Sequence, residues 1–449
     1  MIQLTAVTTL FGAASAAAAI DAGLLGDPDE RVLVISNNAP IPEVVRSLAD
    51  TPGAEAVLSR FDRVVDLGAL LHPQTPSRWK VFAIDLPAQE RLLRTYFELG
   101  DSPVELVVES VHVPPAETLT KVFNEARITI LSEGLMSFGP TRNPQSHTFG
   151  QRLDGMVYLD LVEGLDPLLL SEHGIESHAI APEHFRRLIE EICVAAQVPA
   201  VEDPAPTALV LGQYLSALRL ITPQQETRMQ VDMLKAAKSM GAERVLFKPH
   251  PSAPATNTAA LVAAAGKEGL AIELVNAELS AEAVMATHRL VGVVAGFSTA
   301  LATAQRVFGL PTRCIGTRVM FDALDPYQNS NRIPVTIIDF LHRNADREDA
   351  IDELRRLTVA VAYTMQPDSL ADRRDEAVAY LEGLPEAERT RYITQARLTK
   401  LGLPGGRRPV LPPQVSKAAH DAMERVPPGL SKSVYGSWRK LANARQQRA

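Results

Sequence analysis

The feature that most constrains the fold of this chain is an alternation of short apolar runs with helical patterns. In the first half, strands are predicted at Leu4–Leu10, Arg31–Ser36, Arg63–Leu67, Glu105–Ser110, Ile128–Leu131 and Met156–Leu161. Helices are predicted at Ala13–Ala22, Pro42–Ala49, Pro87–Leu99 and Pro182–Val198. Strands that alternate with helices form βαβ units, so a mostly parallel sheet is expected.

The alternation restarts after a proline-rich segment at residues 199–206, which is typical of a linker. The second half predicts strands at Thr207–Leu211, Arg244–Phe247, Ile272–Leu274 and Leu290–Val294, and helices at Thr222–Met240, Asn257–Gly269, Leu279–Thr287 and Ser298–Phe308. We therefore predict an α/β fold with two Rossmann-like domains, residues 1–200 and 207–385, which are joined by a linker at 201–206 and face each other across a cleft. The active site is expected in that cleft.

The end of the chain differs in charge from the rest. Residues 386–449 contain 13 Lys and Arg but only four Asp and Glu, although the whole chain has a net charge of −8. We predict one helix at Glu386–Leu401 followed by a loosely ordered basic tail. Such a tail is either a solvated terminus or a segment attracted to an anionic membrane. The acidic remainder argues against nucleic-acid binding.

Cysteine usage and hydropathy bear on the cellular location. The two cysteines, Cys193 and Cys314, do not indicate a disulfide framework and suit a reducing cytosol. Residues 11–20 are small and apolar, but no Lys or Arg precedes Arg31, so a secretory signal is not expected. No uncharged apolar run reaches the length of a membrane span. We expect a cytoplasmic protein, with the basic tail as a route to peripheral contact with the inner face of the membrane.

A histidine between two prolines follows one strand of the second half, in the sequence Phe-Lys-Pro-His-Pro at 247–251. Each proline fixes φ near −65° and disfavours helix in the residue before it. Lys248, His250 and Pro251 are therefore expected on a stiff loop at the carboxyl end of a strand, where ligands bind in open α/β sheets. A lysine and a histidine there indicate an anion site, plausibly for phosphate. The alternative is a surface turn with solvated side chains.

Two more loops lie at predicted strand ends. Ser132-Glu133-Gly134 follows a strand of the first half, and a carboxylate there is a candidate general base whose pKa partial burial would raise. Ser298 and Thr299 open an alanine-rich helix, whose unpaired N-terminal amides are suited to phosphate. The alternatives are a capping role for Glu133 and a plain helix cap without a ligand.

Other polar residues lie on comparable edges. Glu278 could accept hydrogen bonds from a ribose diol, or it could be an exposed acid in the first turn of a helix. Gln213 follows the first strand of the second half. Gly12 and the Asn37-Asn38 pair end the first two strands, where they would line the acceptor side. His112, His147 and His288 do not show the spacing of a metal site, and no metal is expected.

Taken in order, these motifs resemble the bacterial sialyltransferases, in particular the α-2,8-polysialyltransferase family. That family is recognised by an acidic-acidic-Gly motif, a His-Pro motif and a later Ser-Ser or Ser-Thr motif. They correspond here to Ser132-Glu133-Gly134, His250-Pro251 and Ser298-Thr299, over roughly residues 1–330. The resemblance implies a GT-B fold, CMP-sialic acid as donor substrate with no cofactor, and a glycan acceptor in surface or capsule polysaccharide synthesis.

The resemblance also implies residue roles. Glu133 would be the base that deprotonates the acceptor hydroxyl, and His250 would contact the donor phosphate as CMP leaves. Ser298 and Thr299 would hold the same phosphate, and Glu278 the ribose. The first acidic position of the family motif is Ser132 here, which leaves the acceptor preference and the donor open.

Two alternatives to sialyl transfer remain at this point. One is another CMP-releasing polymer transferase on the same fold, of the CDP-glycerol type, which would be expected to use histidines as bases where this chain offers Glu133. The other is a non-catalytic protein of polysaccharide assembly.

Overall fold

The structure is a computed structural model that describes residues 1–38, 46–201, 205–213, 215–249, 258–276, 278–345, 347 and 350–407, without side chains at 258–260. The chain divides into two compact units, Met1–Ile393 and Thr394–Ala449. Each is described by itself below. Among the described residues, no helix is long and apolar enough to cross a membrane.

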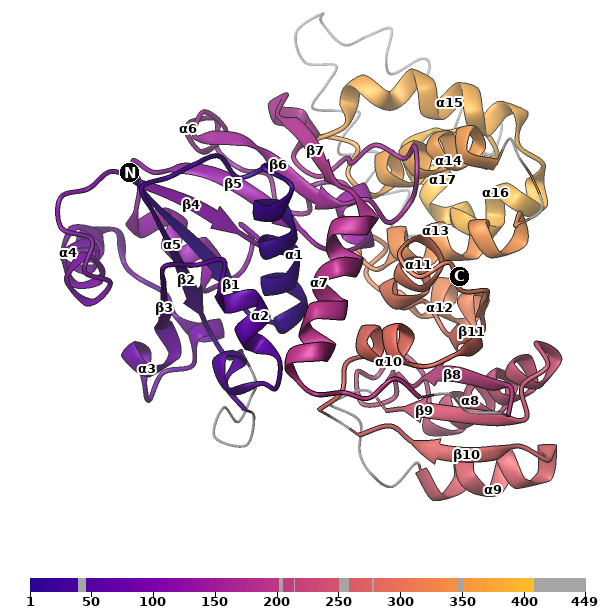
Figure 1. The fold of residues 1–449 in the computed structure, drawn as a ribbon. Helices are drawn as coiled ribbons and strands as arrows, with labels where there is room; N and C mark the ends of the chain where they lie inside the picture. The colour runs from indigo at the N-terminus through magenta and orange to yellow at the C-terminus, as the bar shows by residue number, and fades with distance from the viewer. Residues whose placement is uncertain are drawn as a thin grey trace, which may run out of the picture. The chain divides into compact units, whose positions relative to one another are not determined.

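The first half of the larger unit contains a parallel seven-stranded sheet in the order β3-β2-β1-β4-β5-β6-β7 (Figure 1). Its strands are β1 (Ile2–Val7), β2 (Glu30–Ile35), β3 (Arg63–Asp66), β4 (Val104–Val108), β5 (Arg127–Ser132), β6 (Leu153–Leu159) and β7 (Glu176–Ile180). Every residue of β1 is buried, as expected for a central parallel strand covered on both faces.

Helices cover both faces of this sheet. They are α1 (Leu10–Asp21), α2 (Ala54–Leu58), α3 (Leu67–Leu71), α4 (Leu86–Tyr96), α5 (Ala116–Val122), α6 (His147–Gly150) and α7 (Pro182–Ala195). Alternate residues of β1, including Leu4, enter a core with Phe97 and Leu119 from the side of α4 and α5. On the other face α7 packs against α1 and α2 (Figure 1). The buried alanines of α1 allow this close approach.

The second half contains a parallel five-stranded sheet in the order β10-β9-β8-β11-β12. Its strands are β8 (Thr207–Leu211), β9 (Arg244–Lys248), β10 (Ala271–Leu274), β11 (Leu290–Ala295) and β12 (Thr312–Cys314). The helices of this half are α8 (Pro223–Ser239), α9 (Thr258–Glu268), α10 (Ala281–Thr287), α11 (Thr299–Arg306), α12 (Thr317–Ala323), α13 (Arg332–Arg343), α14 (Ala350–Met365), α15 (Arg374–Gly383) and α16 (Glu386–Tyr392).

The two sheets share one topology, because the first strand of each is an interior strand and the strand order reverses beside it. The reversal lies between β1 and β4 in the first sheet and between β8 and β11 in the second. Ligands bind at such switch points, outside the carboxyl ends of the strands. The predicted fold, two Rossmann-like halves in the GT-B manner, is confirmed, and the sheets lie on either side of the predicted linker at 201–206.

Several predicted elements differ from the structure. β7 and β12 were not predicted, because β7 is polar and β12 has only three residues. Part of the helix predicted at Pro42–Ala49 lies outside the described residues, and residues 48–50 form a 3-10 turn. The single helix predicted at Glu386–Leu401 is wrong, since α16 ends at Tyr392 and α17 (Gln395–Leu401) is a separate helix.

A buried aspartate explains why α16 is part of the larger unit rather than of the C-terminal unit. Asp339 of α13 accepts hydrogen bonds from Thr317 (2.6 Å) and from Arg391 and Tyr392 of α16 (2.6 and 3.0 Å). Burial raises the pKa of Asp339, but these hydrogen bonds and the charge of Arg391 outweigh it, and the net pKa is lowered. α16 is thereby fastened to the larger unit. The smaller unit contains α17, and the rest of the predicted basic tail, residues 408–449, lies outside the described residues.

Candidate functional site

Two carboxylates converge at the carboxyl edge of the first sheet. Glu109 follows β4 and Glu133 follows β5, so both extend from the edge where Thr8 follows the neighbouring β1. Glu109 accepts hydrogen bonds from the Thr8 N–H (3.1 Å) and the Thr8 hydroxyl (2.8 Å). A Cβ atom at Gly12 would lie 2.7 Å from Glu133 Oε2 and nearer still to Glu109 Oε1. Gly12 therefore leaves the space that both carboxylates occupy.

The electrostatics of this edge favour a general base. Burial, together with the charges of Glu109 and Glu282, raises the pKa of Glu133 to about 8. Burial also raises the pKa of Glu109, while its hydrogen bonds from Thr8 oppose the rise. Glu133 Oε2 is buried and has no hydrogen-bond partner among the described residues. A substrate hydroxyl could supply the missing hydrogen bond by donating to this oxygen.

The turn that presents Glu133 is held by two serines. Ser132 Oγ donates to Ser137 Oγ at 3.0 Å, and Ser137 Oγ donates to the carbonyl of Gly134. The turn continues into the 3-10 helix η5 (Leu135–Phe138), which packs against α13 of the second half. The hydrogen bond from Ser132 thus stabilises the turn, and Glu133 is held at the sheet edge rather than on a long loop.

Lys248 has a different setting from the one predicted. It was expected on the loop after the strand, but it is the last residue of β9, and its side chain is buried. Burial lowers the pKa of Lys248, and the charge of Glu282 on α10 partly offsets this. Its carbonyl accepts a hydrogen bond from the Gly212 N–H (2.9 Å). His250 and Pro251, the next predicted site residues, lie outside the described residues.

The neighbouring loops of the second sheet hold Gln213 and the Ser298-Thr299 pair. Ser298 is the N-cap of α11, and its side chain accepts from the N–H of Ala300 at 3.2 Å, so the predicted helix cap is confirmed. Gln213, after β8, packs against Gly296, where an added Cβ would lie 2.9 Å from its Cδ. Its buried Oε1 has no hydrogen-bond partner among the described residues.

The edges of the two sheets meet at Gly134 and Thr299. A Cβ atom at Gly134 would lie 3.5 Å from Thr299 Oγ1, so the acidic turn of one half lies against the first turn of α11 in the other. Glu282 links the same two halves electrostatically, because it repels Glu133 and attracts Lys248. The Glu133 turn and Thr299, which are far apart in sequence, are therefore neighbours, and Glu282 acts electrostatically on both Glu133 and Lys248.

Glu278, the predicted ribose contact, has an ion-pair partner in the structure. It is exposed and forms an ion pair with Arg46 at 2.8 Å. Exposed ion pairs of this kind contribute roughly 0–1 kcal/mol, so a ligand could replace the arginine at little cost.

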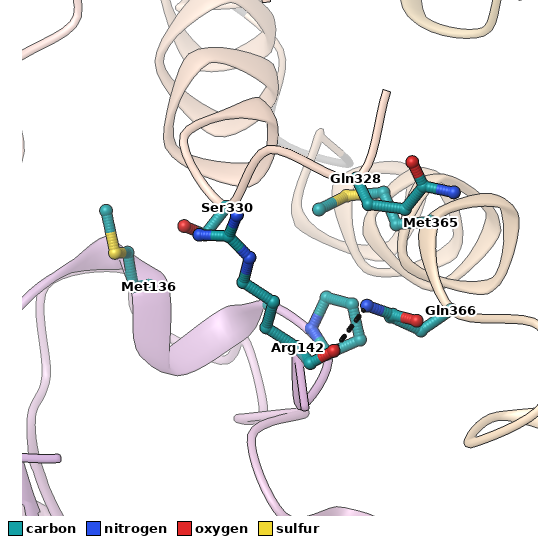
Figure 2. A pocket seen from close by; sticks show the side chains of 8 residues that line it. Met136, Arg142, Gln328, Ser330, Met365 and Gln366 are labelled. Atoms are coloured by element: carbon teal, nitrogen blue, oxygen red, sulfur yellow. Dashed lines mark hydrogen bonds between the residues drawn. The ribbon is translucent and has the colours of Figure 1, made fainter. Parts of the chain in front are cut away.

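A pocket lies beside the Glu133 turn, between it and the helices of the second half (Figure 2). Its lining residues are Met136, Gly139, Pro140, Arg142, Gln328, Ser330, Met365 and Gln366. Gln366, after α14, donates to the carbonyl of Arg142 at 2.8 Å, and the Arg142 side chain extends toward Ser330 (Figure 2). The pocket thus combines polar side chains with the apolar side chains of Met136 and Met365, and it lies next to the turn that holds Glu133.

Sequence reasoning missed Glu109 and Glu282. Glu109 was placed inside a strand predicted to end at Ser110, although β4 ends at Val108. An acid directly after a run of apolar residues was the available signal. Glu282 gave no such signal, since an acid in the first turn of a helix such as α10 is common. Among the described residues, no three His, Cys, Asp or Glu side chains are grouped as metal ligands would be.

One comparison with known proteins agrees with the motifs. The model of the alpha-2,8-polysialyltransferase family matches residues 3–317. No curated protein matches the chain. Similar solved structures include a glycosyltransferase from Rickettsia africae, with 11% identity, coverage of 85% of this chain and 99% of that one, and a TM-score of 0.37. The GT-B domain of a sialyltransferase from Photobacterium damselae has 11% identity, coverage of 75% and 95%, and a TM-score of 0.39.

Proposed function

Because the chain belongs to the alpha-2,8-polysialyltransferase family, we propose that it transfers sialic acid from CMP-sialic acid to a glycan acceptor, without a metal ion, in the synthesis of a surface or capsule polysaccharide. It is a glycosyltransferase of the sialyltransferase type, with a nucleotide-sugar donor and a glycan acceptor as its substrates. In this proposal the first half supplies the base and binds the acceptor, and the second half binds the donor.

The observation that carries the proposal is the contact between the Glu133 turn and the first turn of α11. The unpartnered oxygen of Glu133 is suited to accept a proton from an acceptor hydroxyl. Thr299 lies against the adjacent Gly134, so the helix N-terminus that would hold the donor phosphate is next to the base. A base on one side and an anion site on the other is what transfer from a nucleotide sugar requires.

On the donor side, negative charge develops on CMP as the sugar becomes cation-like. We propose that His250 and the turn ending in Pro251 contact this phosphate together with Ser298 and Thr299, because donors aimed at developing charge stabilise a transition state. Lys248 adds positive charge at the adjacent strand end, and Gln213 presents its unpartnered oxygen to the nucleotide. Glu278 exchanges its exposed partner Arg46 for the ribose.

On the acceptor side, we propose that the glycan extends from Glu133 toward the pocket of Figure 2. Arg142 and Ser330 offer hydrogen-bond donors, and Met136 offers an apolar surface for a sugar face. The basic tail is proposed as a peripheral contact with an anionic membrane on the cytoplasmic side.

The nucleotide preference tests the proposed donor. A thermal-shift panel of CMP, CMP-sialic acid, CDP, CDP-glycerol and UDP is expected to show stabilisation by CMP and CMP-sialic acid. Stabilisation follows RT ln(1 + [L]/Kd), which is about 2.7 kcal/mol at 100-fold excess over Kd. Stabilisation by CDP-glycerol but not by CMP-sialic acid would favour the CDP-glycerol alternative. A response to UDP alone would contradict both.

Replacing His250 tests the phosphate role. His250→Ala is expected to slow hydrolysis of CMP-sialic acid in the absence of acceptor by about tenfold or more, since a hydrogen bond to a charged group is worth roughly 1.5–3 kcal/mol. CMP release, followed by chromatography, measures it, with His178→Ala at an exposed position as the control. Unchanged hydrolysis would remove His250 from the mechanism. If His250→Ala and Glu133→Gln both left cellular function intact, a non-catalytic assembly role would be favoured instead.

A further inference from the structure

Glu109 lies at the switch point of the first sheet, directly after β4 and beside β1. Its carboxylate is fixed rather than mobile, because the N–H and hydroxyl of Thr8 both donate to it. Glu133 comes from the next strand and lies against the same Gly12. The fold therefore holds two carboxylates side by side, one anchored by hydrogen bonds and one with an unpartnered oxygen.

The two carboxylates have different surroundings, so they are expected to lose their protons at different pH values. Burial raises the pKa of both acids, but hydrogen bonds from Thr8 favour the ionised form of Glu109, whereas Glu133 Oε2 receives none among the described residues. When neighbouring acids have such unequal environments, one ionises first and the other keeps its proton to higher pH. Among the residues that the structure describes, the other charged groups that act here are Glu282 of α10, which repels Glu133, and Lys248 of β9, which attracts Glu282.

We infer that Glu109 is a positioning residue for the base, a carboxylate that Thr8 fixes beside Glu133 and whose charge strengthens Glu133 as a proton acceptor. This inference rests on the proposed role of Glu133. It assigns Glu109 no contact with substrate. The negative charge of Glu109 strengthens the pull of Glu133 on an acceptor proton, and it delays the ionisation of Glu133 until higher pH.

A pH profile separates this role from a merely structural one. Glu109→Gln is expected to move the rise of kcat/KM toward lower pH by at least about 0.5 pH units, since a neighbouring like charge raises a carboxyl pKa. Because a less basic Glu133 is also a weaker base, the variant should be slower than wild type at pH 9 by roughly threefold and faster at pH 6. The two profiles therefore cross.

Matched variants make the result specific. Glu105→Gln changes a glutamate near the other end of the same strand and is expected to leave the profile unmoved. Thr8→Val removes one hydrogen bond to Glu109 and should move the profile in the same direction by a smaller amount. Thr8→Val also serves if Glu109→Gln fails to fold. Profiles that are lowered in parallel, with the same midpoint, would overturn the inference.

A second measurement needs no substrate. The stability difference between proteins with and without the Glu133→Gln change, followed against pH, reports the titration of Glu133. Its midpoint should be lower when position 109 is glutamine. If transfer from CMP-sialic acid is not observed but this midpoint moves, the proposed donor is wrong and the carboxylate pair stands. If the midpoint does not move, the inference fails whatever the donor.

Discussion

Glu133→Gln is expected to lower the rate of transfer by at least ~100-fold, because general base catalysis is typically worth roughly 10²–10⁴. Glutamine keeps the size of the side chain but cannot accept the acceptor proton. The rate is measured as product formed from CMP-sialic acid and acceptor at pH 8. Glu125→Gln, at an exposed position outside the site, is the control and should retain wild-type activity. A loss smaller than about tenfold would remove Glu133 from the mechanism.

The same substitution is expected to stabilise the protein. Burial and the charges of Glu109 and Glu282 raise the pKa of Glu133 to about 8, above its value in the unfolded chain. Between the ordinary pKa of glutamate and about 8, the unfolded chain has lost this proton while the folded protein still binds it. Stability therefore falls as pH rises through that window. Glutamine does not titrate, so the variant avoids this loss.

The expected gain at pH 9 is at least ~1 kcal/mol, since one pKa unit corresponds to about 1.4 kcal/mol. The gain should shrink when unfolding is followed at pH 5. An inactive variant that is more stable than wild type is what a functional site built at a cost in stability predicts. A variant equally destabilised at both pH values would indicate that Glu133 is a structural residue.

Gly12→Ala is expected to lower kcat/KM by about 100-fold. The new Cβ would lie 2.7 Å from Glu133 Oε2 and nearer to Glu109 Oε1, so both carboxylates must move aside. A displacement of about 1 Å at a catalytic group can cost on the order of 100-fold. Gly12 lies within α1, where alanine is favoured over glycine by about 1 kcal/mol. This gain opposes the cost of displacing Glu109, which Thr8 holds by hydrogen bonds, so kcat/KM should change far more than the free energy of unfolding.

The matched control is Gly266→Ala. Gly266 lies within α9, and a Cβ there meets nothing within 4 Å. It should bring the same gain in helix stability with unchanged kcat/KM. If Gly12→Ala also retained full activity, the space at Gly12 would not matter to the base.

The positions of the predicted motifs at strand ends show how much of the site could be read from sequence. Ser298 caps α11 as expected, because capping depends on a side chain and the backbone two or three residues away. Lys248 was misplaced by one residue, since it was expected on the loop after the strand but is the buried last residue of β9. Local rules fix a strand end only to within a residue or so.

The sequence by itself determined the two runs of βαβ units, the order of the motifs and the family, since these depend on local periodicity and on residues adjacent in the chain. Only the tertiary structure decided which acids act together. Glu109 and Glu133 are neighbours because β4 pairs with β5, and Glu282 reaches the same site from the other half. Parallel pairing brings the carboxyl ends of strands together at one edge of the sheet, whatever their separation in sequence. Burial at that edge then raises the pKa of Glu133. Neither effect is encoded in any single segment.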